Sequence, residues 1–369
     1  MAKTKAKYRF RLFLWINQFF VLLLLLTYLA PYIPPQLLWP FSIFGLAYPI
    51  LLLINILFII VWLLLLNKNI LYSLLAILVG LGTLNKHFRL QNPDKEQTEK
   101  EIKVLTFNVK NLSNNNEKYA DINIRSSILN YLDDQDAQII CLQEFQTYPS
   151  KGINTVKEFQ ERLSFPYFAE SRYVLQSRFK FVDLMLLYSK FPIIRQIELR
   201  HQDKSYALIA DILYNSDTIR LFNIHLESNH FGKNEYEIFS TPENTTVEQP
   251  SAQVLPLLSK IAKYSKIRNI QVDKISEIIK NTPYPLIICG DFNDTPATYS
   301  YQKLAKNTKD TFIEKGKGYG NTYNGKLPAM RIDYILSDTC FNVNQFEIGK
   351  IRLSDHFPIF STLGLPANK

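Results

Sequence analysis

The sequence predicts an α/β (α+β) domain, in which helices cover mixed β-sheets, behind an N-terminal transmembrane helical segment. Short β-branched runs alternate with helical stretches such as residues 122–132 and 267–279, a pattern typical of α/β layers. The Ile-Ile-Cys runs at residues 139–141 and 287–289 each lead to an acidic residue and look like matching strands from two halves of a sandwich. The first 90 residues, in contrast, contain long apolar runs and no Asp or Glu.

Three apolar runs lie in this first part. Residues 10–29 contain one charged residue near their start, Arg11, and residues 41–66 contain none, and both have about the length that crosses a bilayer. Residues 70–84 form a shorter run, which either spans the membrane, re-enters it or lies at its interface. The sequence therefore predicts that residues 1–90 are a membrane anchor with two or three transmembrane helices.

The charge distribution indicates topology rather than a nucleic-acid partner. Eight of the 42 Lys and Arg residues lie in the first 90 positions, which leaves 34 basic residues against 33 acidic ones in the remainder. The formal net charge of +9 therefore belongs almost wholly to the membrane segment. A basic isoelectric point of this origin is no evidence for a phosphate-binding surface.

The basic tail before residue 10 predicts a cytoplasmic N-terminus by the positive-inside tendency. Two spans would return the rest of the chain to the cytoplasm, and three would place it outside. The short polar link at residues 67–69 suits a cytoplasmic turn after the second span and favours three. We therefore expect an integral inner (plasma) membrane protein whose soluble domain lies on the outer, periplasmic side.

The soluble part begins after a polar linker. Residues 91–101 are rich in Gln, Glu, Lys and Asp and form this linker, and residues 102–369 make up the soluble domain. Within it, residues 229–262 show little periodicity until Val254. We interpret them as a long insertion near the site, either a substrate lid or a mobile loop.

Polar residues follow strand-like runs at six places in the soluble domain. The segments are Asn-Val at 108–109, Leu-Gln-Glu at 142–144, Asn-Ile-His at 223–225, Gly-Asp-Phe-Asn at 290–293, Arg-Ile-Asp at 331–333 and Ser-Asp-His at 354–356. A buried strand that ends in such a residue brings a polar group to the rim of a sheet. Oxygen and imidazole groups gathered at one rim predict a divalent-metal site with a general base, and hence phosphoester hydrolysis.

In this order, the six motifs resemble the endonuclease/exonuclease/phosphatase superfamily of metal-dependent phosphoesterases, in a membrane-anchored bacterial form. The resemblance covers residues 102–364. It implies a four-layer sandwich of two mixed β-sheets flanked by helices, with the catalytic domain at residues 102–369. It also implies a hydrolase acting on ester bonds, a phosphodiesterase or endonuclease-like enzyme.

The resemblance implies a metal site at Asn108, Glu144 and Asp355. Glu144 is the expected carboxylate ligand, Asn108 the amide ligand or orienter, and Asp355 completes the set. Mg²⁺ is the expected ion, with Mn²⁺ as the alternative, because hard cations prefer oxygen ligands.

The resemblance also implies five catalytic residues. Asp291 orients or deprotonates the attacking water, and Asn293, two positions on and therefore able to face the same side, holds the phosphate or the neighbouring carboxylate. His356 contacts the scissile phosphate, with Asp333 behind it fixing its tautomer and charge. His225 is a candidate general acid for the leaving oxygen.

Two alternatives remain open at the level of sequence. The phosphoester substrate is either nucleic acid or phospholipid, since a membrane anchor sets location without naming a substrate. A catalytically inactive module that binds a phosphate ligand on the same fold would predict erosion of the acidic and His residues, and these are all present: Glu144, Asp291, Asp333, Asp355 and His356.

Overall fold

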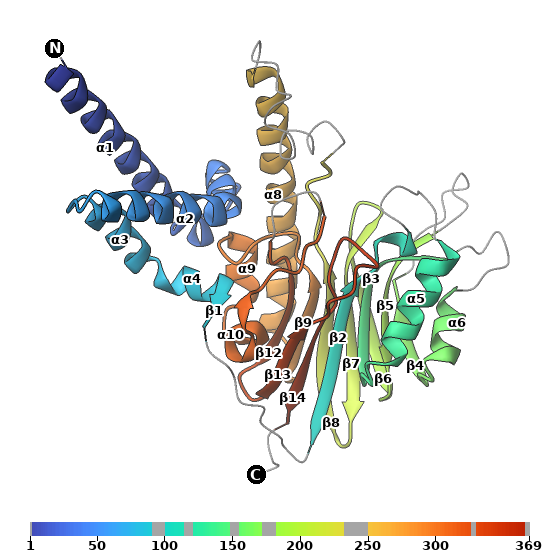
Figure 1. Ribbon diagram of the computed structural model, residues 1–369. Coiled ribbons are helices and arrows are strands. Elements are labelled where there is room, and N and C mark those ends of the chain that lie inside the picture. Colours follow the sequence, from blue (N-terminus) through green and yellow to red (C-terminus); the bar gives the residue numbers. More distant parts are fainter. Residues whose placement is uncertain are drawn as a thin grey trace.

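In a computed structural model, helices at the N-terminus adjoin a body built from two large β-sheets (Figure 1). The structure describes residues 2–90, 100–113, 121–147, 155–171, 182–231, 250–325 and 330–365. Most of the predicted linker, residues 91–99, lies outside the described residues, and Glu101 already opens a strand.

Five helical elements form the N-terminal part, which we call the helical bundle. They are α1 Ala2–Thr27, the 3₁₀ turn η1 Ala30–Tyr32, α2 Pro40–Leu64, α3 Ile70–Val79 and α4 Leu81–His87. Two helices, Tyr8–Tyr32 and Pro40–Leu64, are long and apolar enough to cross a membrane. The pair α3 and α4, bent by 71°, passes the same test together, so the number of spans is two, or three if the bent pair is one span.

A hydrogen-bonded polar network joins three helices of the bundle. Asn17 of α1 donates from Nδ2 to Ser73 Oγ of α3 at 2.7 Å and accepts from Trp62 Nε1 of α2 at 2.8 Å. Ser73 Oγ in turn donates to Asn55 Oδ1 of α2 at 2.9 Å. All four side chains are fully buried. Because each polar group has a partner and none is charged, the network suits a helix interface in an apolar medium.

Two six-stranded sheets form the body. The first has the order β10-β12-β9-β8-β7-β6, with β6 Ile193–His201, β7 Lys204–Tyr214, β8 Asp217–His225, β9 Leu286–Asp291, β10 Thr308–Asp310 and β12 Asp333–Asp338. The second has the order β13-β14-β2-β3-β5-β4, with β2 Glu101–Asn108, β3 Ile139–Thr147, β4 Tyr167–Glu170, β5 Val182–Ser189, β13 Asn342–Ile348 and β14 Ile359–Gly364. Both sheets are mixed, because β8–β9 and β2–β3 are parallel pairs among antiparallel ones.

Helices cover the outer face of each sheet, which confirms the expected sandwich of two mixed sheets flanked by helices. The helices α5 Ile122–Asp133 and α6 Thr155–Arg162 pack on the second sheet. The helices α8 Pro250–Lys280 and α9 Tyr299–Leu304 pack on the first. A third apolar core fills the space between the sheets.

The prediction that residues 229–262 form a long insertion is partly wrong. Residues 250–262 belong to α8, which is much longer than the helix expected at 267–279. The buried Leu257 and Ile261 lie four positions apart, as one face of a helix requires, but Pro256 and the polar residues between them hide this periodicity in the sequence. Residues 232–249 lie outside the described part of the chain.

Three short elements complete the body: the 3₁₀ turn η2 Lys110–Leu112, the helix α10 Thr311–Lys315 and the strand β11 Gly318–Tyr319. The strand β11 pairs with β1, Phe88–Arg89, directly after the helical bundle. The end of the bundle is therefore joined to the body by backbone hydrogen bonds.

Candidate active site

The predicted site residues from four strands meet at one rim of the two sheets. Asn108 closes β2 and lies beside Gln143 of β3, while His225 closes β8 beside Asp291, the last residue of β9. Because each pair of strands is parallel, their carboxyl ends emerge at the same edge. Asn108 then joins the sheets, since its Nδ2 donates to Glu144 Oε1 at 3.0 Å and to Asp291 Oδ2 at 3.1 Å.

The backbone at this rim takes conformations that aim the side chains into the site. Gly290 has φ +127°, and a Cβ added there would lie 2.0 Å from the Ile224 carbonyl oxygen of the neighbouring strand, so only Gly fits before Asp291. Glu144 has φ +51° and lies where the β3–β5 register shifts between Leu142 and Phe145. This bulge re-aims the Glu144 carboxylate out of the strand.

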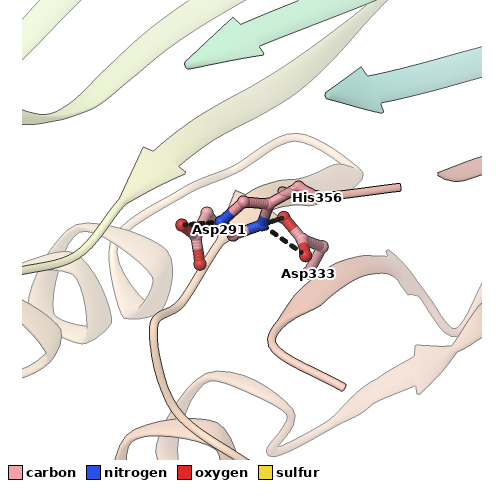
Figure 2. Close-up of side chains that lie close together, drawn as sticks. All are labelled: Asp291, Asp333 and His356. Carbon is pink, nitrogen blue, oxygen red and sulfur yellow. Dashed lines mark hydrogen bonds and ion pairs between the residues drawn. The ribbon is translucent and has the colours of Figure 1, made fainter. Parts of the chain in front are cut away.

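Asp333, His356 and Asp291 form a buried chain of contacts (Figure 2). His356 Nδ1 lies 3.1 and 3.0 Å from the two oxygens of Asp333, and Nε2 lies 3.7 Å from Asp291 Oδ2. Burial alone would lower the pKa of His356, but the two carboxylates outweigh it and raise the pKa to about 10. The imidazole is therefore protonated at neutral pH and held between two acids.

Asp291 receives several donors although it is nearly inaccessible. Its Oδ1 accepts from the Asn293 backbone N–H at 2.8 Å, and its Oδ2 accepts from Asn293 Nδ2 at 3.1 Å as well as from Asn108. Burial, together with the charge of Asp333, raises the pKa of Asp291 to about 6 despite the opposing charge of His356. A carboxylate with such a pKa can accept a proton near neutral pH. Asn293 is fixed by a further bond from its Nδ2 to the Leu226 carbonyl at 2.9 Å.

His225 and Glu144 face each other at the more open side of the rim. His225 Nε2 lies 3.4 Å from Glu144 Oε1 and 3.8 Å from Asp291 Oδ2, and within the described residues it makes no hydrogen bond of good geometry. Burial alone would lower the pKa of His225, but the Glu144 carboxylate, followed by Asp291, raises it. Burial alone would raise the pKa of Glu144, and His225 and Asn108 together lower it to about 2. Glu144 is therefore ionised at neutral pH.

Asp355 is near this group but has a different partner. Its Oδ2 makes a 2.7 Å ion pair with Lys110 Nζ, and no hydrogen bond or ion pair connects it to Glu144 among the residues that the structure describes. The neighbouring Ser354 Oγ donates to the Asn108 carbonyl at 2.8 Å, which ties the loop of Asp355 to the end of β2. A role of Asp355 as metal ligand stays a prediction, and Lys110 is a site residue that the sequence motifs did not point to.

A cavity of about 470 Å³ opens beside Glu144 and His225. Its wall includes Asp183, Lys204 and His230. Nε2 of His230 lies 2.5 Å from Glu227 Oε1, which fixes the orientation of this ring in the wall of the cavity. The cavity places polar and charged groups next to the predicted site residues Glu144 and His225.

Buried polar residues connect the strands and loops next to the predicted site. Gln143 Nε2 donates to Asn223 Oδ1 at 2.7 Å across the two sheets, and Asn223 Nδ2 donates to the Leu186 carbonyl at 2.8 Å. Arg268, fully buried, lies 3.2 Å from Asp294 Oδ2 and donates to the Glu227 carbonyl at 2.9 Å. The contacts of Arg268 hold the loops that directly follow the predicted site residues His225 and Asp291.

The described residues offer two places for a cation. Ligand atoms of Asp291, Asp333 and His356 lie within 4.8 Å of one another. In this group His356 Nδ1 is already turned toward both carboxylate oxygens of Asp333, at 3.1 and 3.0 Å. The ionised Glu144 beside Asn108 matches the oxygen-donor preference of Mg²⁺, and His225 Nε2 lies 3.4 Å from the same carboxylate.

Two family models match this chain. The model described as "Endonuclease/Exonuclease/phosphatase family" matches residues 105–356, more than half of the chain. The model described as "Domain of unknown function (DUF8431)" matches residues 10–87, which correspond to the helical bundle. No curated protein matches the chain.

Solved structures show the same fold at low sequence identity. An endonuclease/exonuclease/phosphatase family protein from Leptotrichia buccalis is 17% identical, with a TM-score of 0.50, over 72% of this chain and 100% of that chain. The human Nocturnin catalytic domain with bound sulfate is 16% identical, with a TM-score of 0.51, over 73% and 97%. A humanized D. rerio TDP2 is 16% identical, with a TM-score of 0.50, over 72% and 99%.

Proposed function

Because the chain belongs to the endonuclease/exonuclease/phosphatase family, we propose that it is a membrane-anchored, divalent-metal-dependent phosphodiesterase that acts by in-line attack of water. The observation that carries the proposal is the buried chain of contacts from Asp333 through His356 and Asp291 to Asn108 and Glu144. It supports the proposal because a proton acceptor, a positive charge and an ionised carboxylate suited to a metal are what such a reaction requires.

Each residue of the site then has a role that follows from its contacts. Asp291, with its pKa near 6, takes a proton from the attacking water, and Asn293 holds its carboxylate in place. The imidazolium of His356 stabilises negative charge on a phosphoryl oxygen. His225, whose Nε2 has no good hydrogen-bond partner among described residues, is placed to protonate the leaving oxygen.

A divalent metal at Glu144 and Asn108, when bound, supplies positive charge to the phosphoryl oxygens. Asp355 is the third predicted ligand, and its present partner Lys110 would have to move for it to reach such an ion. Oxygen ligands favour Mg²⁺, with Mn²⁺ as the alternative.

The contacts of the helical bundle support an outer location of the catalytic domain. The body contacts η1 through α9, the first turns of α2 and the last residue of α4, which all lie at one end of the bundle (Figure 1). The basic N-terminal tail and residues 67–69 belong to the opposite end, because α1 ends and α2 begins at the end near the body (Figure 1). With the tail in the cytoplasm, the catalytic domain is on the periplasmic side of the inner membrane.

Cysteine labelling tests this orientation without new residues. Cys340 is exposed on the body, whereas Cys141 and Cys289 are buried. We expect a membrane-impermeant maleimide to label Cys340 in right-side-out membrane vesicles and to fail in inside-out vesicles, with Cys340→Ser as the control. Labelling only in inside-out vesicles would place the domain in the cytoplasm.

Hydrolysis of a soluble phosphodiester tests the activity. The full chain, purified in detergent, should hydrolyse bis(p-nitrophenyl) phosphate with Mg²⁺ and lose this activity with a chelator. Glu144→Gln and His356→Ala should abolish turnover, whereas Glu277→Gln and His201→Ala, which lie outside the site, should retain it. No turnover together with no Mg²⁺ binding by calorimetry would favour the inactive phosphate-binding module instead.

A further inference from the structure

The helical bundle packs directly on the loop that follows the catalytic strand β9. Thr295 Oγ1 donates to the Gly45 carbonyl of α2 at 3.0 Å. A Cβ added to Gly45 would lie 2.6 Å from the Ala297 carbonyl oxygen, so the two backbones touch without an intervening side chain. Thr295 follows Asp291 by four residues, which span at most about 14 Å when fully extended.

A second contact reaches the strand that carries Asp333. Arg331, two positions before it and nearly fully buried, donates from Nη2 to the Lys86 carbonyl of α4 at 2.8 Å. The Gly320 backbone N–H donates to the His87 carbonyl at 3.1 Å. The bundle therefore holds the loops beside both catalytic aspartates, and these contacts leave the site no freedom to move far from it.

These contacts place the loop after β9, which follows Asp291, near the level of the lipid headgroups. Gly45 lies in the second turn of α2, so the body touches this helix within roughly 8 Å of its start. The headgroup region on each side of a bilayer is about 5–8 Å thick. Exposed apolar residues in the loop before α2, Leu37 and Trp39, belong to the same end of the bundle and suit that boundary.

The N-terminal half of α8 adds a surface of the right chemistry. Gln36, in the loop between the two candidate spans, donates from Nε2 to the Lys266 carbonyl of α8 at 3.1 Å. Before this contact α8 extends beyond the body (Figure 1), with Leu255 64% exposed and Val254 40% exposed. Lys263 is exposed on the same half. Apolar and cationic side chains on one helix end are typical of contact with a lipid surface.

We propose that the site hydrolyses a phosphoester carried by a lipid of the membrane that the bundle spans, with the N-terminal half of α8 resting on that membrane. The proposal rests on the proposed function and names its substrate class. In the reaction the water oxygen bonds to phosphorus, the phosphorus–oxygen bond to the leaving alcohol breaks, Asp291 takes the water proton and His225 gives a proton to the leaving oxygen. The near-neutral charge of residues 91–369 agrees with a lipid rather than a long nucleic-acid substrate.

The test compares lipid and soluble substrates in one preparation. The full chain is reconstituted in vesicles of phosphatidylcholine, phosphatidylethanolamine and phosphatidylglycerol, and phospholipid products are measured beside hydrolysis of bis(p-nitrophenyl) phosphate and nicking of a plasmid. We expect lipid cleavage at least tenfold faster than plasmid nicking at equal phosphodiester concentration. Leu255→Asp should lower lipid cleavage about fivefold to tenfold and leave the soluble activity unchanged, which also shows that the variant is folded.

The matched control is Ile194→Asp, because Ile194 is a similarly exposed apolar residue (56%) on the edge strand β6. It should change neither activity. Hydrolysis of the soluble phosphodiester or of the plasmid without any lipid cleavage would overturn this inference and leave the proposed function standing. Equal lipid cleavage by Leu255→Asp and the unchanged chain would remove α8 from the proposal and overturn it. No turnover of any substrate would overturn the proposed function, and this inference with it.

Discussion

The protein contains two buried polar networks, one in the helical bundle and one in the catalytic domain, and they are built differently. In the bundle, Asn17, Asn55, Ser73 and Trp62 are neutral, and their side-chain groups have hydrogen-bond partners. In the site, ionised or ionisable groups share partners, Asp291 receives several donors, and His225 Nε2 has no good partner among the described residues. A satisfied neutral network fixes how helices pack, whereas a network of charged groups that share partners can bind a cation and exchange protons.

The physical difference lies in the penalty for changing one member. Removing one partner of a buried charge leaves an uncompensated charge, whereas removing a neutral partner costs about one hydrogen bond. Substitutions in the site should therefore change activity and metal binding in addition to any change in stability, whereas substitutions in the bundle should change stability alone. The following experiments test whether activity and stability respond separately to substitutions in the site and in the helical bundle.

The largest effect is expected for Asp291→Asn. The substitution keeps the shape of the side chain but removes the proton acceptor, so we expect kcat for the soluble phosphodiester to fall by roughly 10³-fold or more. The melting temperature should change little. As a comparison, Asp294→Asn breaks the buried pair with Arg268 and should lower the melting temperature more than kcat. The same loss of kcat in both variants would contradict the assignment of the base.

Asp333→Asn should reduce kcat by about 10²-fold and also change the pH profile. The carboxylates of Asp333, Asp291 and Asp355 raise the pKa of His356, and removing the first of them lowers it. Because the protonated imidazole is the active form, activity is present below that pKa and lost above it. The alkaline decline of kcat should therefore begin at lower pH in the variant, and an unchanged decline would count against a charged His356.

Gly45→Val should destabilise the contact between the bundle and the catalytic domain. The added carbon atoms meet the Ala297 carbonyl, and we expect a loss of about 1–3 kcal/mol, measured by thermal unfolding of the full chain. Gly82→Val is the matched control, because a Cβ at Gly82 meets nothing within 4 Å. Equal stability of the two variants would mean that the close contact at Gly45 is absent in the folded protein.

The smallest effect is expected for Asn17→Leu in the bundle. Loss of its hydrogen bonds to Ser73 and Trp62 should lower stability by about 0.6–1.7 kcal/mol and leave hydrolysis of the soluble phosphodiester unchanged. Gln18→Leu, next to it on the helix but outside the network, should have a smaller effect. A loss of activity in Asn17→Leu without a loss of stability would mean that the neutral network also serves the site.

Much of the fold and part of the site could be predicted from the sequence. The helix expected at residues 122–132 matches α5 to within one residue, because its apolar residues recur with the helical period. The two Ile-Ile-Cys runs are β3 and β9, one in each sheet. The two apolar runs of membrane-spanning length, residues 10–29 and 41–66, correspond to the long helices α1 and α2 of the bundle. The early start of α8 was missed because Pro256 and polar residues obscure its periodicity.

The amino-acid sequence by itself determined which chemical groups are available and where each strand or span ends, because hydrophobic period and run length are local properties. Only the tertiary structure decided which of these groups meet. Asn108 contacts Asp291 across 183 positions, Lys110 pairs with Asp355 across 245, and Thr295 contacts Gly45 across 250. No local pattern records such partners, since they follow from how the two sheets and the helical bundle pack together.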